Sequence, residues 1–134
     1  MVHACPTSKL QRASVLIAAL FGLASVFAGG RVLLGLVDPG YVVLLPLVAF
    51  NTVMGIVYIA VARRIRSDAG RGRAAAAGVA VLNLGVLVAV LGFAVAGGTV
   101  ASQSLAAMTL RTGVWGGIFL ALTYVVRRSG AAGA

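Results

Sequence analysis

Acidic residues, histidine and cysteine are almost absent from this chain of 134 residues. Asp38 and Asp68 are its only acids, and it holds one histidine, His3, and one cysteine, Cys5. A single cysteine excludes an intramolecular disulfide and a cysteine-based metal site, and one histidine excludes a bis-histidine haem site. General acid–base catalysis has few groups to use, and no hydrolase, zinc-protease or phosphate-loop motif is present. We therefore expect no catalytic residues, no metal site and no cofactor.

Apolar residues dominate the composition of the chain. They make up 61% of the chain, whereas charged residues make up only 10%, a balance that soluble domains do not have. Four apolar stretches, at about 14–36, 41–62, 74–97 and 105–126, each approach the roughly 20 residues that a helix needs to cross a bilayer. The connections between them are short. The sequence predicts an all-α membrane protein, a four-transmembrane-helix up-down bundle that forms one domain over 1–134.

Basic residues gather on one side of this arrangement. The predicted loops on the other side, around Asp38 and at 98–104, contain none. Because basic residues mark the cytoplasmic side, we expect the N-terminus, a basic loop at 63–73 and the C-terminus to be cytoplasmic, in a bacterial inner membrane. The loop arginines are expected to contact anionic lipid rather than nucleic acid; they are Arg63, Arg64, Arg66, Arg71 and Arg73.

The first apolar stretch also fits a secretory signal. Lys9 and Arg12 would form its basic region, and SVFA before Gly29 would form its cleavage site. Cleavage would leave three helices. The apolar run resumes directly after Gly30 with VLLGLV, so we favour an uncleaved first helix.

Asn51 and Asn83 are expected near the middle of the second and third helices. Polar groups are costly at that depth unless they have partners, so the simplest interpretation is a hydrogen bond between the two side chains. An alternative is a polar pocket for a small ligand, to which the neighbouring side chains contribute: Thr52, Met54, Tyr58 and Thr109 or Thr112.

Arg111 is expected about 9 Å inside the outer boundary of the fourth helix. Helical side chains tilt toward the N-terminus of their helix, and in this helix that direction is outward. We therefore expect the guanidinium to reach the outer headgroups, with Trp115 as a cation–π partner.

Arg31 has the opposite geometry, because in the first helix the same tilt points toward the membrane centre. One interpretation ends that helix at Gly29 and Gly30, which puts Arg31 at the interface. A second continues it to Val37 and pairs Arg31 with Asp38. A third makes Arg31 part of a site for a solute or anion.

Two further patterns concern packing. Gly78, Gly85 and Gly92 recur every seven residues, a spacing that suits close helix contact; we favour contact within the bundle over self-association. Pro46 is expected to kink the second helix.

No motif names a reaction. Our leading hypothesis is a small inner-membrane protein that acts as a non-enzymatic accessory or scaffolding component, with a homo-oligomer or a larger membrane complex as its setting. The alternative is a homo-oligomeric channel or carrier for a small anion or neutral solute, whose path would be lined by polar residues of the membrane interior: Arg31, Asn51, Asn83 and Arg111.

Overall fold

The computed structural model describes residues 8–40 and 43–132. These residues form four α-helices and no strand. The helices are α1 (Lys9–Leu33), α2 (Leu45–Ser67), α3 (Ala69–Val95) and α4 (Ser102–Ala132). All four are long and apolar enough to cross a membrane, by length and composition. The predictions of an all-helical chain and of four long apolar helices are therefore confirmed.

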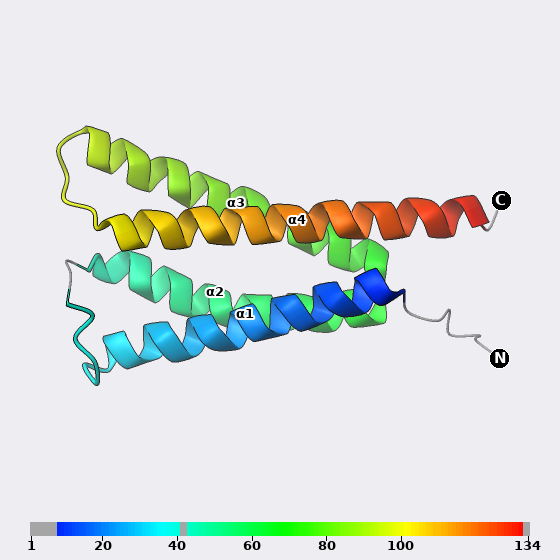
Figure 1. The fold of residues 1–134 in the computed structure, drawn as a ribbon, viewed down its shortest axis with the longest axis horizontal. Coiled ribbons are helices and arrows are strands. Elements are labelled where there is room, and N and C mark those ends of the chain that lie inside the picture. The colour runs from blue at the N-terminus through cyan, green and yellow to red at the C-terminus, as the bar shows by residue number, and fades with distance from the viewer. Residues whose placement is uncertain (1–7, 41–42, 133–134) are drawn as a thin grey trace.

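The helices pack as two hairpins (Figure 1). The most extensive contacts join α1 to α2 and α3 to α4, and fewer contacts join the two hairpins. The connections that follow α1 and α3 lie at one end of the molecule, called the loop end here. The connection between α2 and α3 lies at the opposite end, the turn end, together with the start of α1. Figure 1 also shows that the helices are further apart at the loop end.

Glycine contacts hold the first hairpin together. A Cβ atom added to Gly22 would lie 2.7 Å from the carbonyl oxygen of Gly55, and one added to Gly55 would lie 2.8 Å from that of Gly22 and 2.9 Å from the nitrogen of Val26. The backbones of α1 and α2 therefore touch, which a side chain at either position would prevent. Such close approach stabilises the helix pair through dispersion contacts, which do not depend on the hydrophobic effect of surrounding water.

The three glycines at 78, 85 and 92 do not pack in this way. Nothing lies within 4 Å of a Cβ atom built on any of them, so the predicted contact within the bundle is wrong. Spacing alone identified a glycine-rich face of α3, but it did not give the direction in which that face points.

The end of α1 also differs from both predicted positions. The helix ends at Leu33 because Gly35 adopts a φ of 70°. The nitrogen of Gly35 donates to the oxygen of Val32, at 3.1 Å, and that of Leu36 donates to the oxygen of Arg31, at 3.0 Å. This is the Schellman pattern of helix termination, which favours glycine at the left-handed position.

The segment 63–73, expected as a basic loop, is helical except at Asp68. Asp68 caps α3, since its Oδ1 accepts hydrogen bonds from the nitrogens of Gly70, at 2.8 Å, and Arg71, at 3.2 Å. Arg64 and Arg66 lie in the last turn of α2, where positive charge is favourable. A single capping aspartate thus replaces the predicted loop.

Two other boundaries have simple causes. The second helix starts at Leu45, so Pro46 lies in its first turn, where proline needs no backbone partner and no kink follows. The fourth helix extends beyond the predicted 105–126 at both ends, from Ser102 to Ala132.

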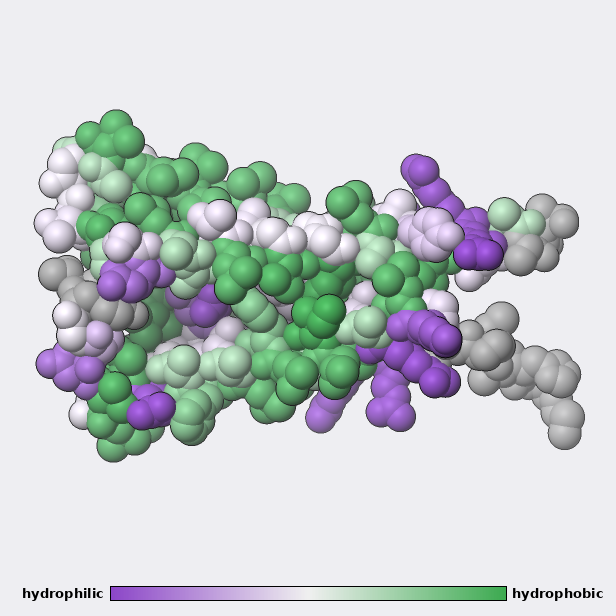
Figure 2. Space-filling model, in the orientation of Figure 1, coloured by the Kyte–Doolittle hydropathy of each residue, from purple (hydrophilic) through white to green (hydrophobic). Residues whose placement is uncertain are grey.

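The outer surface of the bundle is apolar. Figure 2 shows hydrophobic residues along most of the helices, whereas many hydrophilic ones gather at the turn end. The most exposed large apolar side chains in the helices include Leu16, Leu20, Leu23, Phe27, Val53, Ile56, Val81, Val88, Leu110 and Leu120. So large an apolar surface favours a hydrocarbon environment.

The α1–α2 contact gives a testable prediction. Gly55→Ala should lower the free energy of unfolding by about 1 to 3 kcal/mol, because its methyl group would overlap the backbone of α1. Gly85→Ala is the matched control, since its methyl group meets open space and alanine favours helix by about 1 kcal/mol. Unfolding in mixed micelles measures both variants. Equal stability of the two variants would contradict the contact.

Candidate functional site

Tyr58 lies at the centre of the molecule and joins its four helices. The side chain is fully buried in α2. Its ring centroid lies 6.1 Å from that of Phe21 in α1 and 4.7 Å from that of Trp115 in α4. Its hydroxyl donates a hydrogen bond of 3.1 Å to Oδ1 of Asn83 in α3. We call Phe21, Tyr58, Asn83 and Trp115 the central layer.

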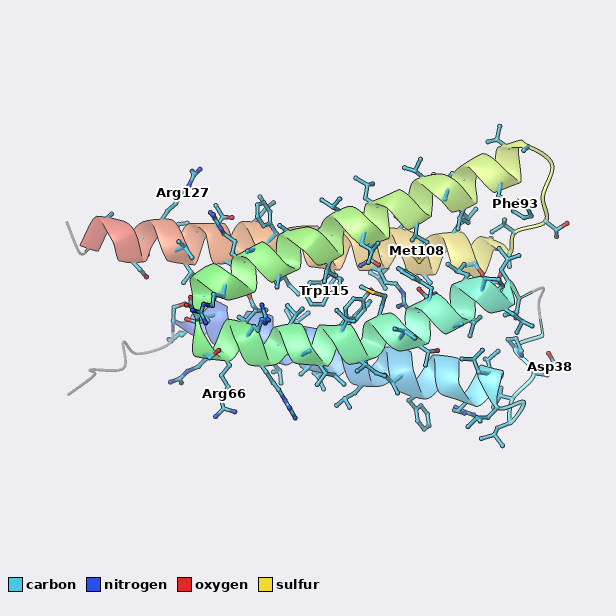
Figure 3. The ribbon with its side chains drawn as sticks, turned by 180° about the vertical axis from the view of Figure 1, so that it is seen from behind. Asp38, Arg66, Phe93, Met108, Trp115 and Arg127 are labelled. Atoms are coloured by element: carbon cyan, nitrogen blue, oxygen red, sulfur yellow. The ribbon has the colours of Figure 1, made fainter. Side chains whose placement is uncertain are left out.

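Helix geometry explains why these four residues meet. Each lies about 18 to 20 Å along its helix from the end of that helix at the loop end of the molecule. Figure 3 shows Trp115 between α2 and α3, with Met108 nearer the loop end. Both side chains are completely buried, with 0% of their surface exposed. They lie seven positions apart on one face of α4.

Apolar clusters lie on both sides of the central layer. The larger extends to the turn end and includes Val61, Ile65 and Leu122. The smaller lies toward the loop end and consists of Leu47, Val90 and Met108, with partly buried neighbours. Apolar side chains therefore lie on both sides of the polar atoms of the layer.

Five buried polar atoms in this region have no hydrogen-bond partner among the described residues. They are Oδ1 of Asn51, Nδ2 of Asn83, Nε and Nη1 of Arg111, and Nε1 of Trp115. Leaving a buried donor or acceptor unpaired costs about 1 to 3 kcal/mol, and more when the group is charged. A native fold keeps few such groups, so these atoms, which lie in the central layer and in the loop-end half of the bundle, are candidates for a binding site.

Arg111 differs most from its predicted position. Its guanidinium carbon lies 5.8 Å from the ring centroid of Phe21, so the side chain extends from α4 toward α1 rather than to the outer headgroups. Its cation–π partner is Phe21 and not Trp115. Within the described residues, neither Asp38 nor Asp68 forms a salt bridge with it. The interhelix ring contact offsets only part of the cost of burying the charge.

Asn51 and Asn83 do not form the predicted hydrogen bond. Asn83 accepts from Tyr58 instead, and Oδ1 of Asn51 has no partner. Asn51 lies about 10 Å closer to the loop end than Tyr58, because the two residues are two helical turns apart. Asn83 is fully buried and Asn51 is partly buried, and the two amides lie at different levels of the bundle.

The threonines of the alternative pocket use their hydroxyl protons within their own helices. Thr52 donates to the oxygen of Val48, and Thr109 and Thr112 donate to those of Leu105 and Met108. These bonds are common for threonine in helices. The unpaired atoms of the region are mostly donors, because four of them are nitrogens and one is an oxygen.

Arg31 lies away from this site. It is an exposed residue in the last turn of α1, and its guanidinium carbon is 5.1 Å from the ring centroid of Phe27. Asp38 accepts a hydrogen bond from the nitrogen of Gly40, at 2.9 Å, and forms no salt bridge with Arg31. The pair between Arg31 and Asp38, which was one of three interpretations of Arg31, is therefore not formed in the described residues.

Gly29 and Gly30 lie inside α1, so the helix does not end at them. A Cβ atom on Gly29 would overlap Oγ1 of Thr52, whereas nothing lies near Gly30. The first glycine thus allows contact with α2, which is a packing role.

The basic residues expected to contact lipid lie around the turn end. Arg66 and Arg127 are at this end in Figure 3, and Asp38 is at the other. Nε of Arg71 lies 3.7 Å from Oδ2 of Asp68, and both side chains are largely exposed, so this pair adds little stability. Of the remaining members of the predicted set, Arg63 and Arg64 are exposed and Arg73 is half-buried.

Comparisons with known proteins give no further guide to these residues. No family model matches the chain, and neither a curated protein nor a solved structure matches it significantly. The chemistry of the site must therefore be inferred from its own atoms.

Those atoms suit an acceptor-rich ligand. Guanidinium, amide and indole nitrogens all donate hydrogen bonds, and the guanidinium adds a positive charge that is always present. Phe21 was not predicted as a neighbour of the site, and Trp115 was predicted only as a cation–π partner of Arg111. Trp115, one helical turn after Arg111, was the available signal, but spacing did not show which helix the pair faces.

The hydrogen bond between Tyr58 and Asn83 gives a second prediction. Tyr58→Phe removes the donor and leaves the buried amide oxygen unpaired, so it should lower the free energy of unfolding by about 1 to 3 kcal/mol. Tyr124→Phe is the control, because the Tyr124 hydroxyl bonds to Arg128 on the exposed surface.

Combining Tyr58→Phe with Asn83→Leu should recover part of the loss, since replacing both partners by apolar groups is less costly than removing one. Unfolding in mixed micelles compares these variants. If Tyr58→Phe were no more destabilising than Tyr124→Phe, the proposed role of the central layer would be wrong.

Proposed function

We propose that the protein is a multi-pass membrane protein whose helices cross the bilayer alternately, with the turn end and both termini in the cytoplasm. The apolar outer surface and the basic residues at the turn end support this orientation. The arginines from Arg63 to Arg73 would then lie near anionic headgroups of the inner membrane. An impermeant maleimide added outside intact cells should not label a Ser67→Cys variant in a Cys5→Ser background. Labelling of that variant would contradict this orientation.

Within that bundle, the function best supported is the binding and transfer of a small anion, as in a carrier or channel. The observation that carries this proposal is the buried pair of unpaired guanidinium nitrogens on Arg111. A charge in an apolar interior needs a counter-charge or hydrogen-bond acceptors. The chain's acids do not supply them within the described residues, so an anion from solution is the simplest partner.

The other unpaired atoms favour the same ligand class. The free nitrogens of Asn83 and Trp115 can donate to an anion, and a neutral solute rich in donors would find only Oδ1 of Asn51. Hydrophilic residues are also visible between the two hairpins in the loop-end half of Figure 2. Because the helices are further apart at the loop end, we propose that the anion enters from there.

Anion flux into proteoliposomes tests this function. Vesicles that contain the wild-type protein should take up a small monovalent anion, such as chloride, nitrate or formate, faster than empty vesicles. Arg111→Gln should reduce this flux at least about tenfold, because a hydrogen bond to a charged group is worth about 1.5 to 3 kcal/mol.

Arg31→Gln is the matched control, since Arg31 is exposed at the loop end and outside the site. Its flux should stay within about twofold of the wild type, because an exposed charge contributes little. Absence of flux through the wild-type protein, or an equal loss in both variants, would contradict the carrier.

A second candidate function is the accessory or scaffolding role. The observation that favours it is the glycine face of α3, where Gly78, Gly85 and Gly92 leave open space. A helix of another chain could approach that face closely. Gly85→Leu should then weaken co-purification of a membrane partner under mild detergent, and a wild-type protein that runs alone as a monomer would count against this role.

A further inference from the structure

Arg111 is the only charged side chain that lies more than two turns from a helix end within the residues that the structure describes. It lies about 14 Å along α4 from the start of that helix at Ser102. The membrane interior therefore carries one fixed positive charge. The other charged residues lie near helix ends or in the connections: Lys9, Arg12, Arg31, Asp38, Arg63, Arg64, Arg66, Asp68, Arg71, Arg73, Arg127 and Arg128.

No side chain of this interior is suited to exchange a proton when the anion binds. The four described helices contain neither an acid nor a histidine. Tyr58 is fully buried, and its hydroxyl proton is held in the hydrogen bond to Asn83. Arg111 keeps its charge, since a guanidinium stays protonated in proteins. The net charge of the site therefore changes only when the anion itself binds or leaves.

The site lies between two hairpins that each form a packing unit. Contacts are extensive within each hairpin and fewer between them. Arg111 belongs to the α3–α4 hairpin, whereas Phe21, which its guanidinium contacts, belongs to the α1–α2 hairpin. The helices are further apart at the loop end (Figure 1), so a tilt of one hairpin against the other would close that end and open the opposite one. Carriers commonly expose a fixed site to alternate sides by such rigid-body motion.

The electrostatic cost of this tilt depends on whether the anion is bound. When the tilt closes an empty site to water, the guanidinium loses its hydration while its charge stays unpaired, which is costly in an apolar interior. A bound monovalent anion makes the site neutral. The loaded site should therefore change sides more easily than the empty one, because removing one partner of a buried ion pair costs more than burying the pair.

We propose that the protein exchanges one monovalent anion for another across the membrane, because only the loaded site changes sides readily. One anion enters for each one that leaves, so the exchange moves no net charge. An open channel would need a continuous path instead, and toward the turn end the interior is filled by the apolar cluster that includes Val61, Ile65 and Leu122. The inference rests on the anion transfer proposed above and adds its mode.

Counterflow in proteoliposomes tests the exchange, with chloride, nitrate and formate as labelled probes. For at least one probe, vesicles loaded with the same unlabelled anion should show at least about tenfold faster uptake than vesicles loaded with gluconate, because the empty site returns slowly. A potassium diffusion potential set with valinomycin should change that exchange by less than about twofold, since the loaded site is neutral.

Two variants accompany the wild-type protein. Arg31→Gln removes an exposed charge outside the site and should keep both results. Arg111→Gln removes the charge on which the mode depends, so its exchange should fall at least about tenfold, toward the uptake of protein-free vesicles.

The failures of the exchange and of the anion transfer are distinguishable. Equal uptake with gluconate inside, or uptake that follows the diffusion potential, would show a channel or uniporter and would overturn the exchange while leaving the transfer intact. Uptake driven by a pH gradient would show proton coupling and would overturn the exchange in the same way. Uptake no faster than in protein-free vesicles under every loading would overturn both the exchange and the transfer on which it rests.

Discussion

The side chain of Tyr58 is the interaction on which the rest of the bundle depends. Through one ring and one hydroxyl it contacts Phe21, Asn83 and Trp115, which belong to the three other helices. The two hairpins have far fewer contacts with each other than within themselves, so the central layer fixes how they face one another. It also separates the close-packed turn-end half from the half in which the helices move apart.

That arrangement gives the loop-end half its chemical character. Arg111 lies one helical turn from Trp115 and contacts the Phe21 ring of the layer, whereas Asn51 lies two turns from Tyr58. Nε and Nη1 of Arg111 and Oδ1 of Asn51 are buried without a hydrogen-bond partner among the described residues. Filling the space with apolar residues would have been more favourable for stability alone. We propose that a ligand completes the hydrogen bonds of these guanidinium and amide groups, and the excess of donors favours an anion.

The sequence was sufficient for the four helices, because long apolar runs determine them almost without tertiary context. Helix ends depended on local backbone chemistry that hydropathy ignores: Gly35 ends α1, and Asp68 caps α3. The polar interior was predicted as a set of residues, but Arg111 was directed outward and Asn51 was paired with Asn83. Those errors share one cause, since spacing places a side chain on a helix face without showing the rotation of that helix in the bundle.

Trp115 offers the most direct test of the central claim, because it is the only tryptophan of the chain and is fully buried beside Tyr58. Its fluorescence can be followed while chloride, nitrate or formate is added to the protein in detergent at constant ionic strength. A saturable change is expected for at least one of these anions in the wild-type protein and none in Arg111→Gln. A spectrum unchanged by all of them, or a change that persists in Arg111→Gln, would contradict an anion site in the interior.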